Sequence, residues 1–330
     1  MYNDIPNYLI DYLNYLETIQ NNSSGTVKEY YYDLRLFLRY IKVVRTSIED
    51  LTLKDFDIDS VDVKNLDFDI IKYVELSQLY QFMSFVTRDR ENSSTSRARK
   101  VASIKSFYRY LKNKAKILSE NPAADLESPK IDKTVPKYLN IAESKSLLNS
   151  VTGEFVERDY AILILFLNCG LRLSELVSID INNIKNDSIV IKGKGSKERT
   201  VYLNESCIEA IDVYMKIRPK NNIIDREALF LSKRKKRISN KTVQYLVKKY
   251  IKLSGLDPKR YSTHKLRHTA ATLMYRYGNV DIRSLQEILG HESITTTEIY
   301  THIDNNHLRN ATKKNPLSDY KKENINHNKI

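Results

Sequence analysis

The sequence predicts a mainly α-helical protein of two domains, with one small antiparallel β-sheet in the second domain. The chain has 330 residues, which is long for one typical domain and enough for two, each with its own hydrophobic core. Apolar residues recur at helical spacing through most of both halves. Three of the seven prolines, Pro122, Pro129 and Pro136, fall in one polar stretch that interrupts this periodicity.

The proline-containing stretch predicts how the chain is divided. Residues 1–115 are expected to form a helical N-terminal domain and residues 116–136 the linker. Residues 137–312 are expected to form the second domain. Residues 313–330 are polar, weakly periodic and rich in Asn and Lys, and they are predicted to be a C-terminal tail.

Three amphipathic helices are predicted in the first domain. Two of them span Tyr8–Ile19 and Val27–Ile41 and are joined by the polar turn Asn21–Gly25. The third begins in the run Ser93–Ser96, since hydroxyl side chains favour the N-cap position, and its buried stripe runs through Val101–Leu111.

The β-structure of the second domain is predicted to be a hairpin. Two short runs rich in β-branched residues, Ser188–Ile191 and Arg199–Leu203, flank Gly193–Lys197. Because glycine permits tight turns, Lys194 is expected at the tip of the hairpin, where it can reach out of the fold.

The charge of the chain indicates a polyanionic partner. The net charge is +13 and the pI is near 9.4, and basic side chains bind nucleic acids by releasing condensed counterions. Residues 88–116 are strongly basic, and Arg97, Lys100 and Lys105 are predicted to contact DNA there. A solvated basic face on a core helix, in a lysine-rich protein, is the alternative.

Composition also excludes several classes of protein. The longest apolar stretch, Ala161–Leu167, is far shorter than the roughly 20 residues that span a bilayer, so no membrane segment is expected. The first basic residue is Lys28, a pattern unlike a secretory signal, and the cytoplasm is the expected location. Cys169 and Cys207 are too few for a disulfide framework or a cysteine metal cluster.

Four short motifs in the second half concentrate side chains suited to phosphate chemistry. They are Gly170–Leu176, Gly193–Gly195, His264–His268 and Leu289–Tyr300. Cleaving a phosphodiester without a metal requires donors that neutralise the nonbridging oxygens, and guanidinium groups do so bidentately. Arg172 and Arg267 are therefore candidates to contact one phosphate from two sides. For either arginine alone, a structural ion pair or a plain DNA-backbone contact is the alternative.

The histidines are assigned by helical spacing. His264 and Arg267 are three residues apart, so in a helix they share a face and can touch the same phosphate. His268 is adjacent to Arg267 and is predicted to point elsewhere, with a structural role.

Two further side chains could complete a strand-cleavage reaction. The ammonium of Lys194 could protonate a leaving 5′ oxygen, with a simple phosphate contact as the alternative. The phenol oxygen of Tyr300 could attack phosphorus and form a covalent ester that stores the bond energy, so that rejoining needs no ATP. Tyrosine occurs 23 times, and most copies are expected to be packing residues.

In order and spacing, these motifs resemble those of the tyrosine recombinases of the phage integrase family, and among them those of the Xer type. The resemblance implies a SAM-like helical core-binding domain and a mainly helical catalytic domain with a small sheet, the tyrosine recombinase catalytic fold. It implies cleavage through a 3′-phosphotyrosine and a Holliday junction, without metal, ATP or another cofactor. The implied site roles are a nucleophile at Tyr300, phosphate activation by Arg172 and Arg267, a general acid at Lys194, phosphate binding and proton handling by His264 and His291, and a bracing carboxylate at Glu175.

The resemblance also implies the partners. These are double-stranded DNA with an inverted-repeat site and a homotetramer on synapsed DNA, in which each protomer donates a segment near His307–Thr312 to its neighbour. Xer-type systems differ in their need for a second recombinase or a DNA translocase. The task, whether chromosome-dimer resolution at cell division, DNA inversion or mobile-element transfer, depends on where target sites lie. Thr263, where many relatives have proline, and Cys169 are small departures from the family pattern.

Two other functions fit parts of this pattern. A noncatalytic DNA-binding regulator would explain the basic helix, although it has no need for a phenol and a proton donor together. A type IB topoisomerase would use similar chemistry, but it lacks sequence-specific synapsis and the core-binding domain. The combined motifs favour a recombinase over both.

Overall fold

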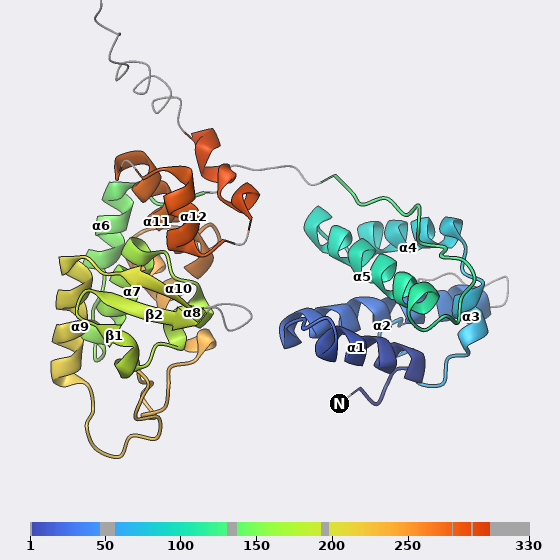
Figure 1. The fold of residues 1–330 in the computed structure, drawn as a ribbon, viewed down its shortest axis with the longest axis horizontal. Coiled ribbons are helices and arrows are strands. Elements are labelled where there is room, and N and C mark those ends of the chain that lie inside the picture. The colour runs from blue at the N-terminus through green and yellow to red at the C-terminus, as the bar shows by residue number, and fades with distance from the viewer. Residues whose placement is uncertain are drawn as a thin grey trace, which may run out of the picture. The chain divides into compact units, whose positions relative to one another are not determined.

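The computed structural model describes residues 2–46, 57–130, 137–192, 198–278, 280–291 and 293–303. The chain forms two compact units, Met1–Lys133 and Thr134–Ile330, called here the N-terminal and C-terminal units (Figure 1). Both are mainly helical, and the small antiparallel sheet lies in the C-terminal unit. The predicted fold class is confirmed.

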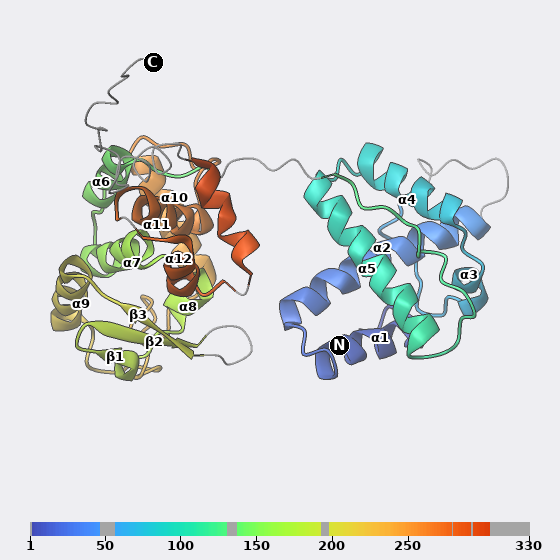
Figure 2. The same cartoon turned by 45° about the horizontal axis from the view of Figure 1, so that its top comes forward.

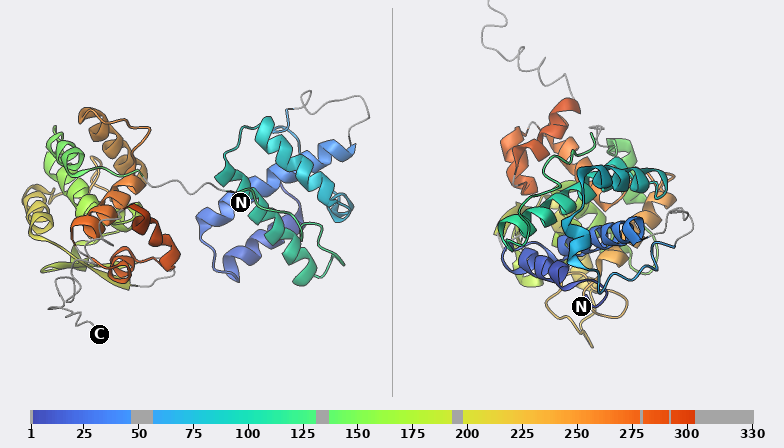
Figure 3. Two further views of the ribbon diagram at one scale, coloured as in Figure 1. Left: turned by 90° about the horizontal axis from the view of Figure 1, so that it is seen from above. Right: turned by 90° about the vertical axis from the view of Figure 1, so that its right-hand side faces the viewer.

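The N-terminal unit is a helical bundle (Figures 1 and 3). Its helices are α1 (Asn7–Thr18), α2 (Ser24–Thr46), α3 (Phe68–Lys72), α4 (Leu76–Arg88) and α5 (Ser94–Asn113). Helix α2 packs against the other four. The three helices predicted from sequence correspond to α1, α2 and α5. Helix α2 begins earlier than predicted because the Ser23 hydroxyl accepts a hydrogen bond from the Thr26 amide at 3.2 Å.

The core of this unit extends beyond residue 115. Leu118, Ala123 and Leu126 are buried in the same cluster as the helices. Two hydrogen bonds hold this segment to α5, because the Lys105 ammonium donates to the carbonyls of Ala124 and Leu126 at 2.8 and 2.9 Å. Part of the stretch predicted as linker therefore packs on the N-terminal unit.

The basic face of α5 differs from the prediction at Lys100. This side chain is only 6% exposed, and its ammonium lies 2.6 Å from a carboxylate oxygen of Asp33 on α2, itself 1% exposed. The prediction that Lys100 is available to DNA is wrong. Lys100 precedes Ile104 and Phe107 by four and seven residues, which places it on the buried stripe of the helix. Arg97 is half-buried and donates a hydrogen bond to the Thr87 hydroxyl at 3.1 Å.

The C-terminal unit carries the sheet and the remaining helices. Its elements are α6 (Ile141–Asn149), α7 (Val156–Cys169), α8 (Leu173–Val177), η2 (Ile181–Asn183), β1 (Ile184–Lys185), β2 (Ser188–Lys192), β3 (Glu198–Tyr202), α9 (Glu205–Ile217), α10 (Asn240–Leu253), α11 (Thr263–Tyr277), α12 (Ile282–Leu289), η4 (Ile294–Thr296) and η5 (Glu298–Ile303). Helix α7 lies between α9 and α11 (Figure 2). The apolar run Ala161–Leu167 is buried throughout and forms the centre of the core. No described helix is both long and apolar enough to cross a membrane.

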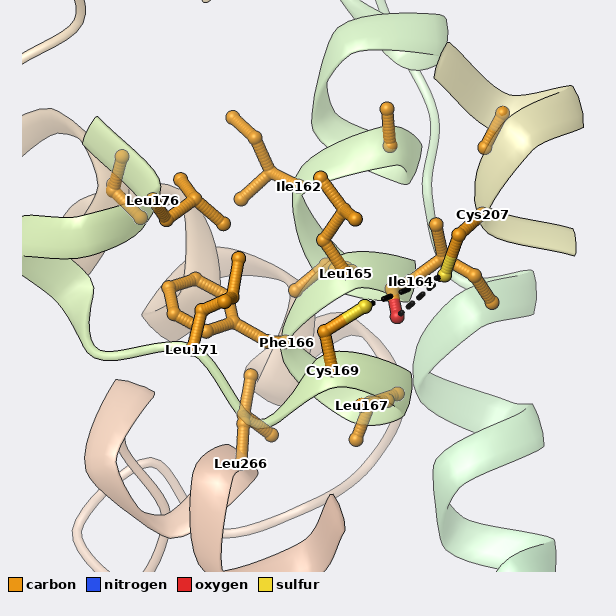
Figure 4. Packing of buried hydrophobic residues seen from close by; sticks show 14 of the residues in the cluster. Ile162, Ile164, Leu165, Phe166, Leu167, Cys169, Leu171, Leu176, Cys207 and Leu266 are labelled. Atoms are coloured by element: carbon orange, nitrogen blue, oxygen red, sulfur yellow. Dashed lines mark hydrogen bonds between the residues drawn. The ribbon is translucent and has the colours of Figure 1, made fainter. Parts of the chain in front are cut away.

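The end of α7 is packed on several sides (Figure 4). Leu171 and Leu266 are buried beside Phe166 in the same cluster. The sulfur of Cys169, the last residue of α7, lies 3.8 Å from that of Cys207 on α9, and both are buried free thiols. The core thus fixes the point at which the chain leaves α7.

The predicted hairpin is confirmed as β2 and β3. The three strands are in the order β1-β2-β3 and are antiparallel, with Ile189 opposite Val201 and Ile191 opposite Arg199. The residues between β2 and β3, which include Lys194, lie outside the described part of the chain, as do the predicted donated segment His307–Thr312 and the tail 313–330.

We predict that Lys100→Ala destabilises the protein by about 3 kcal/mol, because it leaves the buried Asp33 carboxylate without its closest cation. Denaturant unfolding of the full chain measures this change. Lys112→Ala, an exposed position on the same helix, is the control and should change stability by no more than about 0.5 kcal/mol. Normal stability with weakened DNA binding in Lys100→Ala would contradict the buried role.

A candidate phosphate-binding active site

The site begins where α7 ends. Gly170 has φ of +59°, and a Cβ at this position would lie 2.9 Å from a methyl carbon of Leu289. Only glycine fits this left-handed, closely packed turn. The turn leads directly to Arg172, the N-cap residue of α8. Three residues on, Glu175 accepts hydrogen bonds from the Arg172 amide and guanidinium, both at 2.7 Å.

The carboxylate of Glu175 is the centre of a cluster of guanidinium groups. Glu175 is 3% exposed and accepts two hydrogen bonds from Arg199 on β3, at 2.5 and 2.9 Å. A nitrogen of Arg267 lies 3.7 Å from the same carboxylate. Burial alone would raise the pKa of Glu175, but the hydrogen bonds from Arg199 and from the Arg172 amide outweigh it and lower the pKa to about 2.

The cluster has more positive than negative charge. Three guanidinium groups surround one carboxylate, which leaves a net charge of +2. Such a surplus, partly shielded from water, favours the binding of an anion such as a phosphate.

The two arginines predicted to contact phosphate are brought together, but in different environments. Arg267 is buried, and its two terminal nitrogens donate to the carbonyls of Gly170 at 2.7 Å and Leu289 at 2.6 Å. Burial, and next the nearby Arg172, lower the pKa of Arg267 to about 10, so it stays charged at neutral pH. The Arg172 side chain is 40% exposed and donates one hydrogen bond to the Gly290 carbonyl at 2.7 Å. Arg172 is therefore the more accessible of the two.

The prediction for His268 is wrong. It does not point away from the site: its Nε2 lies 3.1 Å from Nε2 of His264, and its Nδ1 lies 2.7 Å from the hydroxyl oxygen of Tyr300. Adjacent residues of a helix point in different directions, so the spacing from Arg267 predicts another face for His268. The relevant spacing is four residues from His264, which places both rings on one face of α11.

Tyr300 is almost completely buried. Its side chain is 1% exposed and packs against Ala271, Leu285 and Leu289. Burial raises the pKa of Tyr300 to about 12, so the phenol is neutral at physiological pH. Its hydroxyl is held within the protein by His268.

His291 follows the glycine that ends α12. Its Nδ1 lies 2.9 Å from the hydroxyl of Thr297, a buried residue. Burial, and next the charges of Arg267 and Arg172, lower the pKa of His291 to about 4, so the ring is neutral. Burial and then Arg267 also lower the pKa of His264. Neutral imidazoles can either donate or accept a proton.

Two site residues were not found from sequence. Arg199 is the first. It lies two residues before Val201 in β3, so both side chains point to the inward face of the strand. A charged residue on the same face as a buried valine was the signal in the sequence. Thr297 is the second, and nothing in the sequence links it to His291.

The described residues thus bring together Arg172, Glu175, Arg267, His264, His291 and Tyr300. Lys194 lies outside the described residues. Among the residues that the structure describes, no group of three or more His, Cys, Asp or Glu side chains is placed to hold a metal ion. The arrangement can bind an anion with guanidinium groups and supply a phenol oxygen next to neutral imidazoles.

Comparison with known proteins identifies relatives along most of the chain. Residues 137–307 match the sequence model described as "Phage integrase family". A protein named tyrosine recombinase XerC from Caldanaerobacter subterraneus subsp. tengcongensis is 56% identical over 313 residues, covering 95% of this chain and 88% of that protein. Another, from Thermodesulfovibrio yellowstonii, is 33% identical and covers 94% of this chain and 97% of its own.

Solved structures share the fold. XerH site-specific recombinase bound to palindromic difH substrate, a post-cleavage complex, aligns with a TM-score of 0.67 at 20% identity, over 93% of this chain and 94% of that one. A lambda integrase tetramer bound to a Holliday junction aligns with a TM-score of 0.62 at 16% identity, over 87% and 77%. Neither a regulator nor a topoisomerase is supported by these similarities.

We predict that Glu175→Gln lowers the free energy of unfolding at pH 7 by about 3 kcal/mol, because the folded-state pKa of about 2 lies well below the ordinary value of 4.5. A depressed carboxylate pKa stabilises the fold above pH 4.5, and this contribution is lost as the pH falls towards 2. The difference between the two proteins should halve near about pH 3.

Denaturant unfolding at several pH values checks this prediction. Glu209→Gln, at an exposed position on α9, is the control and should show no such pH-dependent difference. A constant difference between wild type and Glu175→Gln from pH 7 to pH 3 would contradict the depressed pKa.

Proposed function

This chain belongs to the phage integrase family, and we propose that it performs site-specific recombination of DNA through a covalent bond between Tyr300 and a DNA phosphate. The observation that carries the assignment of the site is the proximity of the Tyr300 phenol to Arg267, a member of a guanidinium cluster of net positive charge. A phosphodiester in that cluster would have its nonbridging oxygens neutralised while a nucleophile lies within the same unit.

The chemistry follows from these groups. The Tyr300 oxygen attacks phosphorus, the P–O5′ bond breaks, and the product is a 3′-phosphotyrosine and a free 5′ hydroxyl once the leaving oxygen has taken a proton. Lys194 is the proposed donor of that proton. Attack by the 5′ hydroxyl of another strand reverses these steps and releases Tyr300. The ester conserves the bond energy, so neither ATP nor a metal has to take part.

Arg172 and Arg267 lie in different environments, and we propose a different role for each. Arg172 has an accessible guanidinium and is proposed to contact the phosphate directly. Arg267 is proposed to contribute its charge and to hold Gly170 next to Leu289, which fixes the turn that presents Arg172. Glu175 braces the cluster and stays ionised throughout.

His264 and His291 are proposed to contact the same phosphate as Arg172. His264 is exposed in the first turn of α11, where the helix N-terminus also favours an anion. His291 is oriented by its hydrogen bond with Thr297. Both rings could donate to nonbridging oxygens as negative charge develops there.

The proposed partner is double-stranded DNA with an inverted-repeat site, bound by four copies of the chain. A lambda integrase of the same fold has been solved as a tetramer bound to a Holliday junction, which supports this assembly for the present chain. Arg97 remains a proposed DNA contact. Lys105 is also proposed to contact DNA, although its ammonium already donates to the carbonyls of Ala124 and Leu126. We also propose a cytoplasmic location, since Cys169 and Cys207 are adjacent yet remain free thiols.

We predict that Tyr300→Phe abolishes the covalent protein–DNA product and leaves DNA binding unchanged, because the ring still packs but the nucleophilic oxygen is gone. Each protein is incubated with a nicked suicide duplex that carries an inverted-repeat site to which the protein binds. A denaturing gel then measures the covalent product. Covalent product from Tyr300→Phe would rule out this nucleophile.

A second prediction separates chemistry from binding. Arg172→Ala should slow formation of the covalent product by about 100-fold or more, with little loss of affinity, because it removes a donor that acts on the charge of the transition state. Arg97→Ala should instead weaken binding and reduce its salt dependence. Single-turnover cleavage and salt titrations provide the two readouts. If both variants change binding alone, the proposed role of Arg172 is wrong.

A further inference from the structure

His268 joins the proposed nucleophile to the surface of the site. On one side its Nδ1 is 2.7 Å from the Tyr300 hydroxyl oxygen, and on the other its Nε2 is 3.1 Å from Nε2 of His264. His268 is buried, whereas His264 is exposed. The three side chains form one continuous chain of hydrogen bonds from the buried phenol to the edge where a phosphate would bind.

The positions of the hydrogens determine which atom donates in each of these hydrogen bonds. A neutral imidazole carries one N–H and one acceptor nitrogen. Within the described residues, the buried Tyr300 hydroxyl has His268 as its hydrogen-bond partner, so the hydroxyl donates to Nδ1 of His268. His268 must then carry its hydrogen on Nε2 and donate to Nε2 of His264, which leaves the His264 hydrogen on Nδ1. The opposite direction would bury the phenol hydrogen without an acceptor.

The proton affinities exclude His268 as the final acceptor of the phenol proton. Burial, and next the charges of His264, Lys265 and Arg267, lower the pKa of His268 to about 3. Burial raises the pKa of Tyr300 to about 12. A His268 imidazolium is thus strongly disfavoured, but His268 can pass a proton on if it gives up one as it receives another.

His264 is the group at which a proton could remain. Its pKa is lowered by burial and then by Arg267, Lys265 and Arg172, and it faces the neutral ring of His268. A phosphate bound beside it would bring negative charge that offsets these cations and stabilises an imidazolium.

We propose that His268 relays the phenolic proton of Tyr300 to His264 as the phosphotyrosine bond forms. This relay rests on the proposed function, since it assumes that Tyr300 is the nucleophile. The phenol proton moves to Nδ1 of His268 while the Nε2 proton of His268 moves to Nε2 of His264. His268 is neutral before and after, His264 becomes an imidazolium next to the phosphate, and the phenol oxygen uses its electron pair to bond phosphorus. Resealing returns both protons.

The variant His268→Asn tests whether His268 only positions the Tyr300 hydroxyl or also transfers its proton. The Asn side-chain oxygen can replace Nδ1 as acceptor for the Tyr300 hydroxyl, but it cannot pass a proton to His264. We expect this variant to bind DNA normally and to form covalent product about 100-fold more slowly at pH 7. Because hydroxide must then remove the proton, its rate should rise about tenfold per pH unit up to pH 9, whereas the wild-type rate should level off.

A substrate with sulfur at the bridging 5′ position identifies the proton concerned, because a thiolate leaves without protonation. Lys194→Ala should regain activity on this substrate, and His268→Asn should not. Recovery of His268→Asn would mean that His268 serves the leaving group, and would overturn the relay. A slow rate with the wild-type pH profile would likewise overturn it, because it would indicate a structural role alone.

Tyr300→Phe distinguishes failure of the relay from failure of the proposed function. If Tyr300→Phe is inactive but His268→Asn has the wild-type rate and pH profile, only the relay is wrong. If Tyr300→Phe still forms product, the nucleophile is wrong and the relay falls with it.

A measurement on the unmodified protein does not depend on the folding of any variant. With ¹⁵N-labelled histidine, NMR of the ring nitrogens reports which nitrogen of each ring carries hydrogen. The relay predicts hydrogen on Nε2 of His268 and on Nδ1 of His264 in the free protein. Hydrogen on Nδ1 of His268 would reverse the chain and contradict the proposal.

Discussion

The site depends on the ion pairs between the buried carboxylate of Glu175 and three arginine side chains. Three guanidinium groups from α8, β3 and α11 approach it, and without an anion between them they would repel one another. One carboxylate offsets one of three positive charges, so the cluster can form during folding and still retain affinity for a phosphate. Because Arg199 reaches Glu175 from the sheet, the same contact also fixes the hairpin relative to α8.

From this centre the site changes gradually from buried to accessible. Arg267 is buried and tied to main-chain carbonyls, Arg172 is partly exposed, and His264 lies at the surface. The proposed nucleophile, Tyr300, is on the buried side, where its phenol is neutral and hydrogen-bonded to His268.

The sequence was sufficient for the fold class, for the predicted helices and the hairpin, and for Arg172, Glu175 and Arg267, but not for Arg199, which also contacts Glu175. Helical and strand periodicities carry that information because they determine which side chains share a face. The errors came from contacts between distant segments. The spacing of Lys100 from Ile104 and Phe107 places it on the buried stripe, but the carboxylate that pairs with it there, Asp33, is 67 residues away and no local pattern links the two. The link between His268 and Tyr300 depends on how η5 packs against α11, which no local pattern specifies.

The identity of the nucleophile can be tested by mapping the covalent product. The chain contains 23 tyrosines, so the position of the attached nucleotide is highly discriminating. The wild-type protein would be trapped on a suicide substrate and digested with a protease and a nuclease, and the modified peptide would be sequenced by mass spectrometry. The structure predicts that the residual nucleotide is attached through phosphate to Tyr300. A nucleotide on any other residue would contradict the site described above.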